Sequence, residues 1–411
     1  MHTFIILCII NSFTKMNKNT IWVFILLSTI LHLHAQPNTD VYVFDLNFDN
    51  GNIKLSNPKN ISNNDGYDNQ PSFLNNSSIL FASTRDGQTD IRLFNIEAGS
   101  TTTWITDTPT GSEYSPLKIP NKKAVSAIRL DLDGLQRLYE YNLKNGDSKP
   151  ILKDAKVGYH VWYNSYTLVH TVLIENRMDL VISNLKEKTS QTLQKNVGRS
   201  LSKIPNTDAV SFISKEENTW QIKAINPITK EIKNIANTYK NSEDICWLKD
   251  GSIVTGNGKS ILRINPNEDV EWELLQSFKE EAINAISRIA VSENSKRLAF
   301  VAEESPAKIV QKQIDAYNAR DIEAFMTTYS KNIILMNYPN QELYKGSEKM
   351  KADYAAFFES TPDLNCKVLN RIVIGNKVID EEYITANGDN FSAVAIYEVE
   401  NGKITKVTFI R

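Results

Sequence analysis

The chain has 411 residues, of which 41% are hydrophobic and 23% are charged, values typical of a folded soluble protein. This length exceeds what one typical hydrophobic core holds, so it predicts two domains. The formal net charge of -2 gives no electrostatic reason to expect a nucleic acid or an anionic membrane as a partner.

Residues 1–36 have the pattern of a secretory signal peptide. Two lysines and several polar residues precede the apolar run Ile21 to Leu33, and the small residue Ala35 offers a cleavage point. Met16 begins this pattern, which makes it a second candidate for the true start. The run is short for a membrane span, although an uncleaved anchor is the alternative. We therefore expect an exported protein of the bacterial envelope, periplasmic or secreted, with no stable membrane span.

A short pattern recurs from residue 40 to about residue 303, and it consists of alternating apolar residues followed by a polar turn. Alternation at every second position predicts half-buried strands. Successive copies lie roughly 40 to 50 residues apart, the period of a four-stranded propeller blade. The copies begin at Asp40, Asp90, Arg137, Met178, Trp220 and Ser260.

The strand count predicts five full blades and a sixth that is divided between the two ends of the repeat region. Residues Ile286 to Ala302 supply two strands with no following partner, whereas Val41 to Leu46 and Ile53 to Ile61 supply two with no predecessor. Together these strands would complete a sixth blade and close the ring, leaving no unpaired edge. A β-sandwich of similar strands is the alternative, but it does not explain the long repeat.

The clearest copy of the repeat runs from Tyr67 to Ile96. Two strands joined by a polar turn are followed by Thr84-Arg-Asp-Gly, where Asp86 and Gly87 begin the hairpin to the next strand. This segment resembles the repeat of TolB-like propellers, relatives of WD-repeat proteins that are found in many exported bacterial proteins. The resemblance implies a TolB-like, all-β six-bladed propeller over residues 37–303.

Helical periodicity begins where the repeat ends. Pro306 suits the first turn of a helix whose apolar positions continue at spacings of three and four to Tyr317. Further helices are expected over Ile322 to Tyr329 and over Ser347 to Glu359, the latter capped by Ser347. The expected strands cover Ile333 to Met336, Cys366 to Ile374, Val378 to Ala386, Phe391 to Val399 and Ile404 to Arg411.

Helices first and a long antiparallel sheet last predict an α+β domain over residues 304–411. Four segments resemble the nuclear transport factor 2-like superfamily, especially its SnoaL-like and steroid-isomerase-like branch: Ala316 to Phe325, Tyr344 to Met350, Ile374 to Glu382 and Ala395 to Val407. The resemblance implies a cone-shaped α+β barrel. It does not imply one activity, because this fold hosts many functions.

The catalytic set of the ketosteroid isomerases is not preserved. Those enzymes use an Asp base together with a Tyr and a protonated Asp. Alignment places Gln313 at the Tyr, Asn337 or Tyr338 at the base, and the stretch Ala393 to Ala395 at the second Asp. The domain also contains no histidine, which excludes Ser-His or Cys-His catalysis and a His-based zinc site there. No metal and no cofactor is predicted.

Two acidic residues mark a candidate pocket. Asp380 and Glu382 share one face of a strand with Val378 and Ile384. If that face lines the barrel, one carboxyl group could hold a raised pKa and act as a base or acid. The alternatives are that the opposite face is buried and the acids are solvated, or that the pair only binds a cationic or hydroxylated ligand. The candidate neighbours are Tyr317, Asn337, Tyr338 and Arg371.

These features favour an exported binding protein that is not an enzyme. The propeller is expected to be the scaffold for a protein, peptide or glycan partner. The C-terminal barrel is expected to bind a small apolar ligand or to form a dimer. The alternative is an enzyme of the isomerase or cyclase type that uses Asp380 or Glu382 for acid–base chemistry on a small apolar substrate.

Overall fold

The computed structural model describes residues 38–49, 52–64, 66–99, 102–279, 283–400 and 402–410. The predicted signal peptide, residues 1–36, lies outside these ranges. None of the helices in the described part of the chain is long and apolar enough to cross a membrane.

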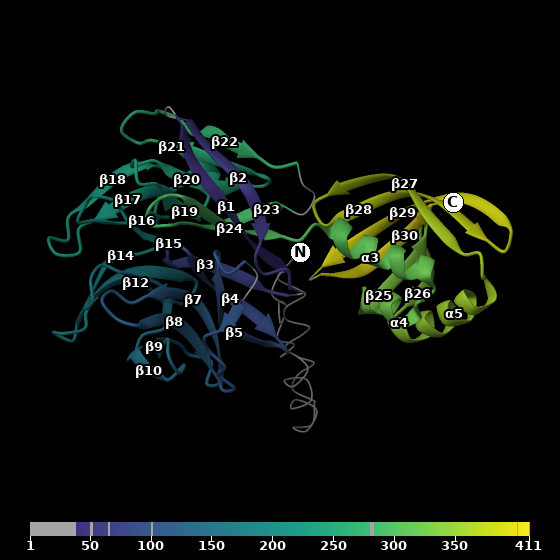
Figure 1. The fold of residues 1–411 in the computed structure, drawn as a ribbon, viewed down its shortest axis with the longest axis horizontal. Helices are drawn as coiled ribbons and strands as arrows, with labels where there is room; N and C mark the ends of the chain where they lie inside the picture. Colours follow the sequence, from purple (N-terminus) through teal and green to yellow (C-terminus); the bar gives the residue numbers. More distant parts are fainter. Residues whose placement is uncertain are drawn as a thin grey trace, which may run out of the picture. The chain divides into compact units, whose positions relative to one another are not determined.

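Six four-stranded antiparallel sheets follow one another along the first part of the chain (Figure 1). Five of them are made of four consecutive strands. The first two are β3 (Asp68–Asn75), β4 (Ser78–Arg85), β5 (Gln88–Asn95) and β6 (Thr102–Trp104), then β7 (Gly111–Lys118), β8 (Ala124–Asp131), β9 (Gln136–Asn142) and β10 (Ser148–Leu152). The third is β11 (Val157–Trp162), β12 (Thr167–Ile174), β13 (Arg177–Asn184) and β14 (Thr189–Gln194). The last two are β15 (Val197–Lys203), β16 (Val210–Ser214), β17 (Gln221–Ile225) and β18 (Ile232–Asn237), then β19 (Ile245–Trp247), β20 (Ile253–Asn257), β21 (Ser260–Ile264) and β22 (Glu273–Ser277).

The sixth sheet is built from both ends of this region. Its strand order is β2-β1-β24-β23, with β1 (Thr39–Asp49), β2 (Asn52–Asn60), β23 (Asn284–Val291) and β24 (Arg297–Glu303). The antiparallel ladder between β1 and β24 runs from Thr39 opposite Glu303 to Asp45 opposite Arg297. The predicted six-bladed propeller, with its last blade divided between the chain ends, is therefore confirmed.

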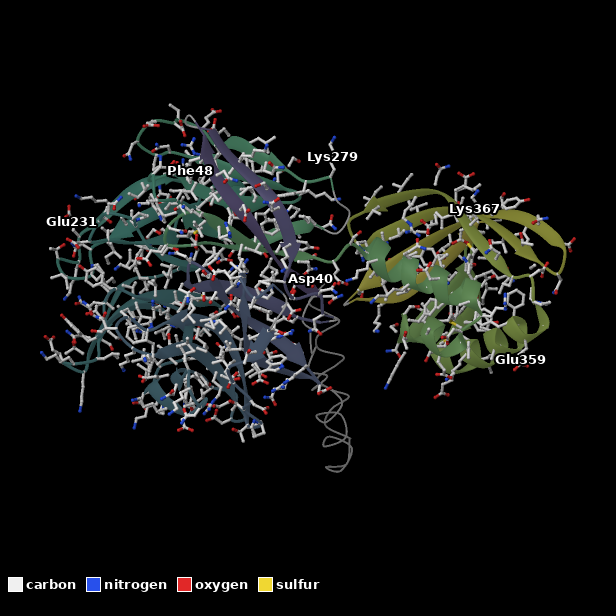
Figure 2. All side chains as sticks on the ribbon, viewed as in Figure 1. Asp40, Phe48, Glu231, Lys279, Glu359 and Lys367 are labelled. Carbon is white, nitrogen blue, oxygen red and sulfur yellow. The ribbon has the colours of Figure 1, made fainter. Side chains whose placement is uncertain are left out.

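Figure 2 draws the side chains of the described residues on the ribbon. Clusters of buried apolar side chains join neighbouring sheets of the propeller. One such cluster contains Val41 and Val301 of the divided blade together with Ile79 and Phe81 of the next. These residues occupy alternate positions of their strands, as expected when one face of a strand is buried. Full burial of an aliphatic or Phe side chain contributes about 1.5–3 kcal/mol, so contacts between blades stabilise the ring.

The remainder of the chain folds as three helices on a six-stranded sheet. The helices are α3 (Pro306–Ala319), α4 (Ile322–Thr327) and α5 (Ser347–Ser360). The sheet order is β26-β25-β30-β29-β28-β27, with β25 and β30 parallel and the other pairs antiparallel. The strands are β25 (Tyr329–Asn337), β26 (Gln341–Lys345), β27 (Asn365–Ile374), β28 (Lys377–Ala386), β29 (Asp389–Glu400) and β30 (Lys403–Ile410). The predicted α+β architecture is confirmed.

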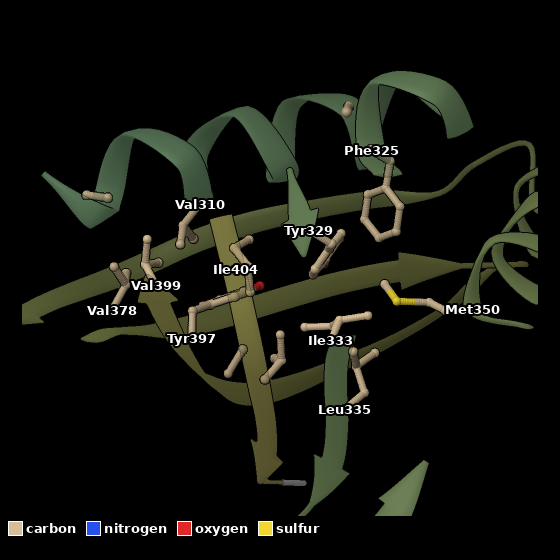
Figure 3. Packing of buried hydrophobic residues seen from close by; sticks show 14 of the residues in the cluster. Val310, Phe325, Tyr329, Ile333, Leu335, Met350, Val378, Tyr397, Val399 and Ile404 are labelled. Atoms are coloured by element: carbon tan, nitrogen blue, oxygen red, sulfur yellow. The ribbon is translucent and has the colours of Figure 1, made fainter. Parts of the chain in front are cut away.

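The core of this domain lies between the helices and one face of the sheet (Figure 3). Val310 of α3 and Phe325 of α4 contribute from the helices, and Tyr397 and Ile404 contribute from the strands. All four are buried, so this sheet face is closed to solvent around them.

Three local predictions need correction. Helix α4 ends at Thr327, and Tyr329 already belongs to a strand. No strand was expected between the strand Ile333 to Met336 and the helix that begins at Ser347, but this segment contains a short strand, β26, which pairs with β25. Ser347 does not cap α5, because Gly346 occupies the capping position at φ 89, a conformation that favours glycine. Ser305 caps α3 with Pro306 in its first turn, as the sequence suggested for Pro306.

Candidate functional site

A cavity of about 970 Å³ runs along the first strands of the propeller sheets. First strands of neighbouring sheets contact one another, so they form the inner wall of the ring. The cavity is lined by residues of these strands and by the turns that lead to the second strands. Ligand sites in proteins are typically cavities of about 300–1,000 Å³, so its size suits a bound chain segment or small molecule.

Among the residues that line the cavity, one position at or beside each inner strand recurs from blade to blade. The positions recur roughly 40 to 45 residues apart, once per blade. We call these six residues the cavity ring: Gln70, Ser115, Tyr159, Arg199, Asp244 and Arg288. Five of the six inner strands also show a register shift close to this position. A bulge of this kind interrupts the ladder and redirects a side chain, as observed near functional sites.

Three members of the cavity ring have a left-handed backbone. The φ angles are 55° at Gln70, 51° at Ser115 and 49° at Arg288. Non-glycine residues in such conformations cost about 1–3 kcal/mol each and persist only where the surrounding structure imposes them. Equivalent strain at the same position of three blades indicates that the ladder is distorted to present side chains to the cavity.

Arg199 and Asp244 form a bidentate ion pair in the cavity ring. The Arg199 Nε lies 2.9 Å from Asp244 Oδ1, and Nη2 lies 2.5 Å from Oδ2. Burial alone would raise the pKa of Asp244, but the hydrogen bonds from Arg199 outweigh it and lower the pKa below its ordinary value. This pair is therefore ionised and internally neutralised at physiological pH.

Arg288 has a different set of partners. Its Nη2 donates to the Tyr159 hydroxyl oxygen at 3.1 Å, and its guanidinium lies 5.1 Å from the centre of the Tyr159 ring. Tyr159 belongs to the third continuous sheet and Arg288 to the divided one, so the contact joins opposite sides of the ring. Among the described residues, no carboxylate oxygen lies within 4.0 Å of this guanidinium.

Exposed charged side chains surround the entrance of the cavity. Lys118, Lys203 and Lys249 are cationic, and Asp208 and Glu293 are acidic. Together with the cavity ring, five cationic and three acidic side chains line the cavity. Since Asp244 is neutralised by Arg199, the cavity carries an excess of positive charge.

The second candidate site lies in the C-terminal domain, on the face of β28 that carries Asp380 and Glu382. Asp380 is fully buried and Glu382 is 4% exposed, whereas Glu381 between them is exposed. The alternative in which the opposite face is buried and the two acids are solvated is therefore wrong.

Asp380 is held by Arg371. The Arg371 Nε and Nη2 donate to the two carboxylate oxygens of Asp380, each at 2.7 Å. The Arg371 Nη1 also donates to Gln311 Oε1 of helix α3 at 3.0 Å. Both oxygens of Asp380 thus have a protein partner, and the carboxylate is engaged in a buried ion pair.

Glu382 is bonded by a phenol instead of a cation. The Tyr397 hydroxyl donates to Glu382 Oε1 at 2.7 Å. Burial raises the pKa of Glu382 to about 7, the Tyr397 hydrogen bond opposes this rise, and the charge of Asp380 adds to it. The same burial and the nearby Glu382 raise the pKa of the Cys366 thiol well above its ordinary value. Glu382 is the group of this domain that titrates near neutrality.

The other predicted pocket residues are dispersed. Tyr317 is half-buried and packs against Phe325 and Phe358 at ring distances of 6.0 and 5.6 Å. Asn337 donates to Gln341 Oε1 at 3.1 Å, and Tyr338 is 67% exposed. Within the described part of the chain, neither Asn337 nor Tyr338 has a hydrogen bond to Asp380 or Glu382.

The two histidines outside the predicted signal peptide are direct cross-strand partners, His160 on β11 and His170 on β12. Their Nε2 atoms bond to hydroxyls, of Ser126 at 2.7 Å and of Ser183 at 2.8 Å. Burial lowers the pKa of His160 to about 3 and that of His170 to about 4. No group of three or more His, Cys, Asp or Glu side chains suited to a metal ion occurs in the described ranges.

Tyr397 and all six members of the cavity ring were not singled out from the sequence. The signal for Tyr397 was present, since Ala395, Tyr397 and Val399 alternate along β29 and are buried. The signal for the cavity ring was the repeat spacing itself. The side chains at these positions could not have identified the ring, because the six positions hold five residue types and only arginine occurs twice.

These observations define a protein class: a closed six-bladed β-propeller followed by an α+β domain. Within the α+β domain, residues 310–407 match the family model described as a SnoaL-like domain. The predicted propeller and the predicted SnoaL-like domain are thus both confirmed. A comparison with curated proteins finds no match for the chain.

Solved structures similar to each part are known. TolB from Acinetobacter baumannii is 11% identical, with a TM-score of 0.44, over 65% of this chain and 64% of that chain. A cystatin-fold protein from Novosphingobium aromaticivorans is 25% identical, with a TM-score of 0.25, over 26% of this chain and 97% of that chain. A nuclear transport factor 2-like protein from Cytophaga hutchinsonii is 23% identical, with a TM-score of 0.23, over 25% of this chain and 87% of that chain.

Proposed function

We propose that this protein is an exported binding protein whose propeller holds a protein, peptide or glycan partner in the central cavity. The observation that carries the proposal is the cavity of about 970 Å³, which is lined by residues from all six blades. Strained backbone at three positions of the cavity ring supports the same conclusion, because strain of this kind concentrates where ligands bind.

Filling the cavity tests this proposal. Ser202 of β15 lines the cavity and is half-buried, so Ser202→Trp should fill it. The tagged full chain should recover a partner from envelope extract, and the variant should lose it. Thr189→Trp is the matched control, because Thr189 is an exposed position on the outermost strand β14. Equal recovery by wild type and Ser202→Trp, or no partner at all, would contradict the proposal.

Export and the domain boundaries belong to the same proposal. We propose that residues 1–36 are removed as a signal peptide and that the propeller and the C-terminal domain span residues 37–303 and 304–411. Mass spectrometry of the mature protein from a bacterial envelope fraction should find an N-terminus at Gln36 or Pro37. A mature chain that retains the apolar run Ile21 to Leu33 would contradict cleavage.

Acid–base chemistry in the C-terminal domain is the second candidate function. The observation that favours it is the pKa of about 7 for Glu382, since a general base or acid works best when its pKa lies near the operating pH. Asp380 is less suited to this role because Arg371 occupies both of its oxygens.

Proton exchange tests this second function. Incubation with enolisable apolar ketones in heavy water should produce α-deuteration by the wild type and none by Glu382→Gln. Glu381→Gln is the matched control, because Glu381 is the exposed neighbour on the same strand. Absence of exchange by the wild type would leave this domain as a module for ligand binding or dimerisation.

A further inference from the structure

We propose that the cavity of the propeller binds its ligand through a carboxylate group, which is received by Arg288 and Tyr159. This inference rests on the proposed binding function and names the chemistry of the ligand. A carboxylate can come from two sources, a peptide chain or a free small acid, and the experiment below separates them.

The first step concerns charge. Arg199 is compensated by Asp244, and Glu243 lies 3.7 Å from it as well. Arg288 has no such compensation within 4.0 Å among the described residues. A half-buried guanidinium is always protonated, so Arg288 presents to the cavity a cation that is hydrogen-bonded to no carboxylate of the described residues, while the charge of Asp244 acts on it from farther away.

The second step concerns hydrogen-bond donors. Arginine carries five N–H donors, and the described partner of the Arg288 side chain is the Tyr159 oxygen. Because the Tyr159 oxygen accepts that bond, its own hydroxyl proton is directed elsewhere. A carboxylate oxygen beside both groups would accept from the guanidinium and from the phenol. Charge-assisted bonds of this type are the strong ones in proteins.

The third step concerns competition inside the cavity. Asp244 is an acid of the cavity whose charge acts on both Arg199 and Arg288, and both of its carboxylate oxygens accept from the Arg199 side chain. It is therefore occupied and remains in place. The left-handed backbone at Arg288, with φ 49°, fixes the direction in which the side chain leaves the strand. The guanidinium is thus positioned before any ligand arrives, which lowers the entropic cost of binding.

The test measures binding of defined carboxylate probes to the full chain. The probes are pools of random heptapeptides with a free C-terminus, the same pools with an amidated C-terminus and with Asn and Gln in place of Asp and Glu, and glutarate. Inorganic phosphate is included as a different anion. Binding is followed by fluorescence anisotropy of labelled peptides and by calorimetry for the small anions.

Arg288→Met should weaken carboxylate binding about tenfold to a hundredfold, because it removes a charge-assisted interaction. Tyr159→Phe keeps the fold and the charge and should weaken binding by a smaller factor. Arg297→Met is the matched control, because Arg297 lies on β24 of the same blade and pairs with Asp45 outside the cavity. This control should bind as the wild type does.

The arms of the experiment identify the source of the carboxylate. Binding of the peptide pools that is lost on amidation and amide substitution assigns a peptide carboxylate, and binding of glutarate alone assigns a free acid. The proposal is overturned if no carboxylate probe binds the wild type, if Arg288→Met binds as well as the wild type, or if phosphate binds more tightly than every carboxylate. Partner capture that is sensitive to Ser202→Trp but indifferent to Arg288→Met would refute the carboxylate while leaving the proposed function in place.

Discussion

The propeller cavity and the core of the SnoaL-like domain both contain an arginine, an aspartate and a tyrosine, in different surroundings. Each holds a bidentate Arg–Asp pair, Arg199 with Asp244 and Arg371 with Asp380. Each also holds one further charged residue that is bonded to a tyrosine hydroxyl.

That further residue behaves differently in the two places. In the propeller it is Arg288, half-buried beside an open cavity, and it keeps its charge. In the C-terminal domain it is Glu382, 4% exposed, and burial raises its pKa to about 7. A guanidinium remains a cation wherever it lies, whereas burial makes a carboxyl group such as Glu382 take up a proton near neutral pH.

The largest expected effect tests how strongly the two ion pairs depend on burial. Arg371→Met should lower the free energy of unfolding by about 3–5 kcal/mol, because it leaves the carboxylate of Asp380 buried without a cation. Arg199→Met should cost less, since the Arg199 side chain is 28% exposed and water can replace it. Urea unfolding of both variants measures the difference.

The double variant Arg371→Met with Asp380→Leu serves as the control for this prediction. It should recover most of the lost stability, because apolar pairs of similar volume replace buried ion pairs without loss. A single variant that costs less than about 1 kcal/mol would show that the pair is effectively solvated.

The next effect concerns pH. Glu382 has a pKa of about 7 in the folded chain and an ordinary value of 4.5 in the unfolded chain. Its contribution to stability is therefore complete below pH 4.5 and is lost as pH rises to about 7. The loss should reach about 3 kcal/mol, since each pKa unit corresponds to about 1.4 kcal/mol.

Glu382→Gln should remove this pH dependence. Unfolding free energies of the wild type and the variant, measured from pH 4 to pH 8, should diverge as pH rises, with the variant becoming relatively more stable. Glu381→Gln, at the exposed neighbouring position, should leave the pH profile unchanged. Parallel profiles for the wild type and Glu382→Gln would contradict the raised pKa.

The two tyrosines provide the smallest effects. Tyr397→Phe removes a donor from Glu382, so it should raise the pKa of Glu382 further and cost about 1–2 kcal/mol at pH 8. Tyr159→Phe should change stability by about 0.5 kcal/mol or less, because its hydroxyl lies at a cavity that water can enter. Thermal unfolding at pH 8 measures the loss of stability in each of the two variants. Equal losses would contradict the expected difference between the buried Tyr397 hydroxyl and the Tyr159 hydroxyl at the cavity.

The architecture was predictable from the sequence because it depends on periodicity. A repeat of roughly 40 to 50 residues predicted blades, and the unpaired strands at its two ends predicted closure. The face of β28 that carries Asp380 and Glu382 followed from alternation at every second residue.

What the sequence did not predict depends on where strands bend and which side chains meet across them. Five of the six cavity-ring positions lie near register shifts. Pro71 and Pro116, which follow Gln70 and Ser115, mark two of these irregularities in the sequence, whereas no proline marks the one at Arg288. Arg371 was expected near Asp380 and Glu382, but its bidentate pairing with Asp380 depends on the register of β27 against β28, in which the two residues are opposite each other. Asn337 and Tyr338 were expected at a pocket from an alignment, whereas the structure places Tyr338 at the surface.

The divided blade has a consequence for the order in which the protein forms. Strand β1 is among the first parts of the propeller to be synthesised, yet its partner β24 is the last. Until residues 297–303 are available, the ring is an open arc with unpaired backbone groups at both ends. Such edges are prone to pair with other chains. An incomplete or truncated chain should therefore aggregate, whereas in the finished chain the two ends of the propeller region pair with each other through β1 and β24. Every productive folding event must wait for the final strand.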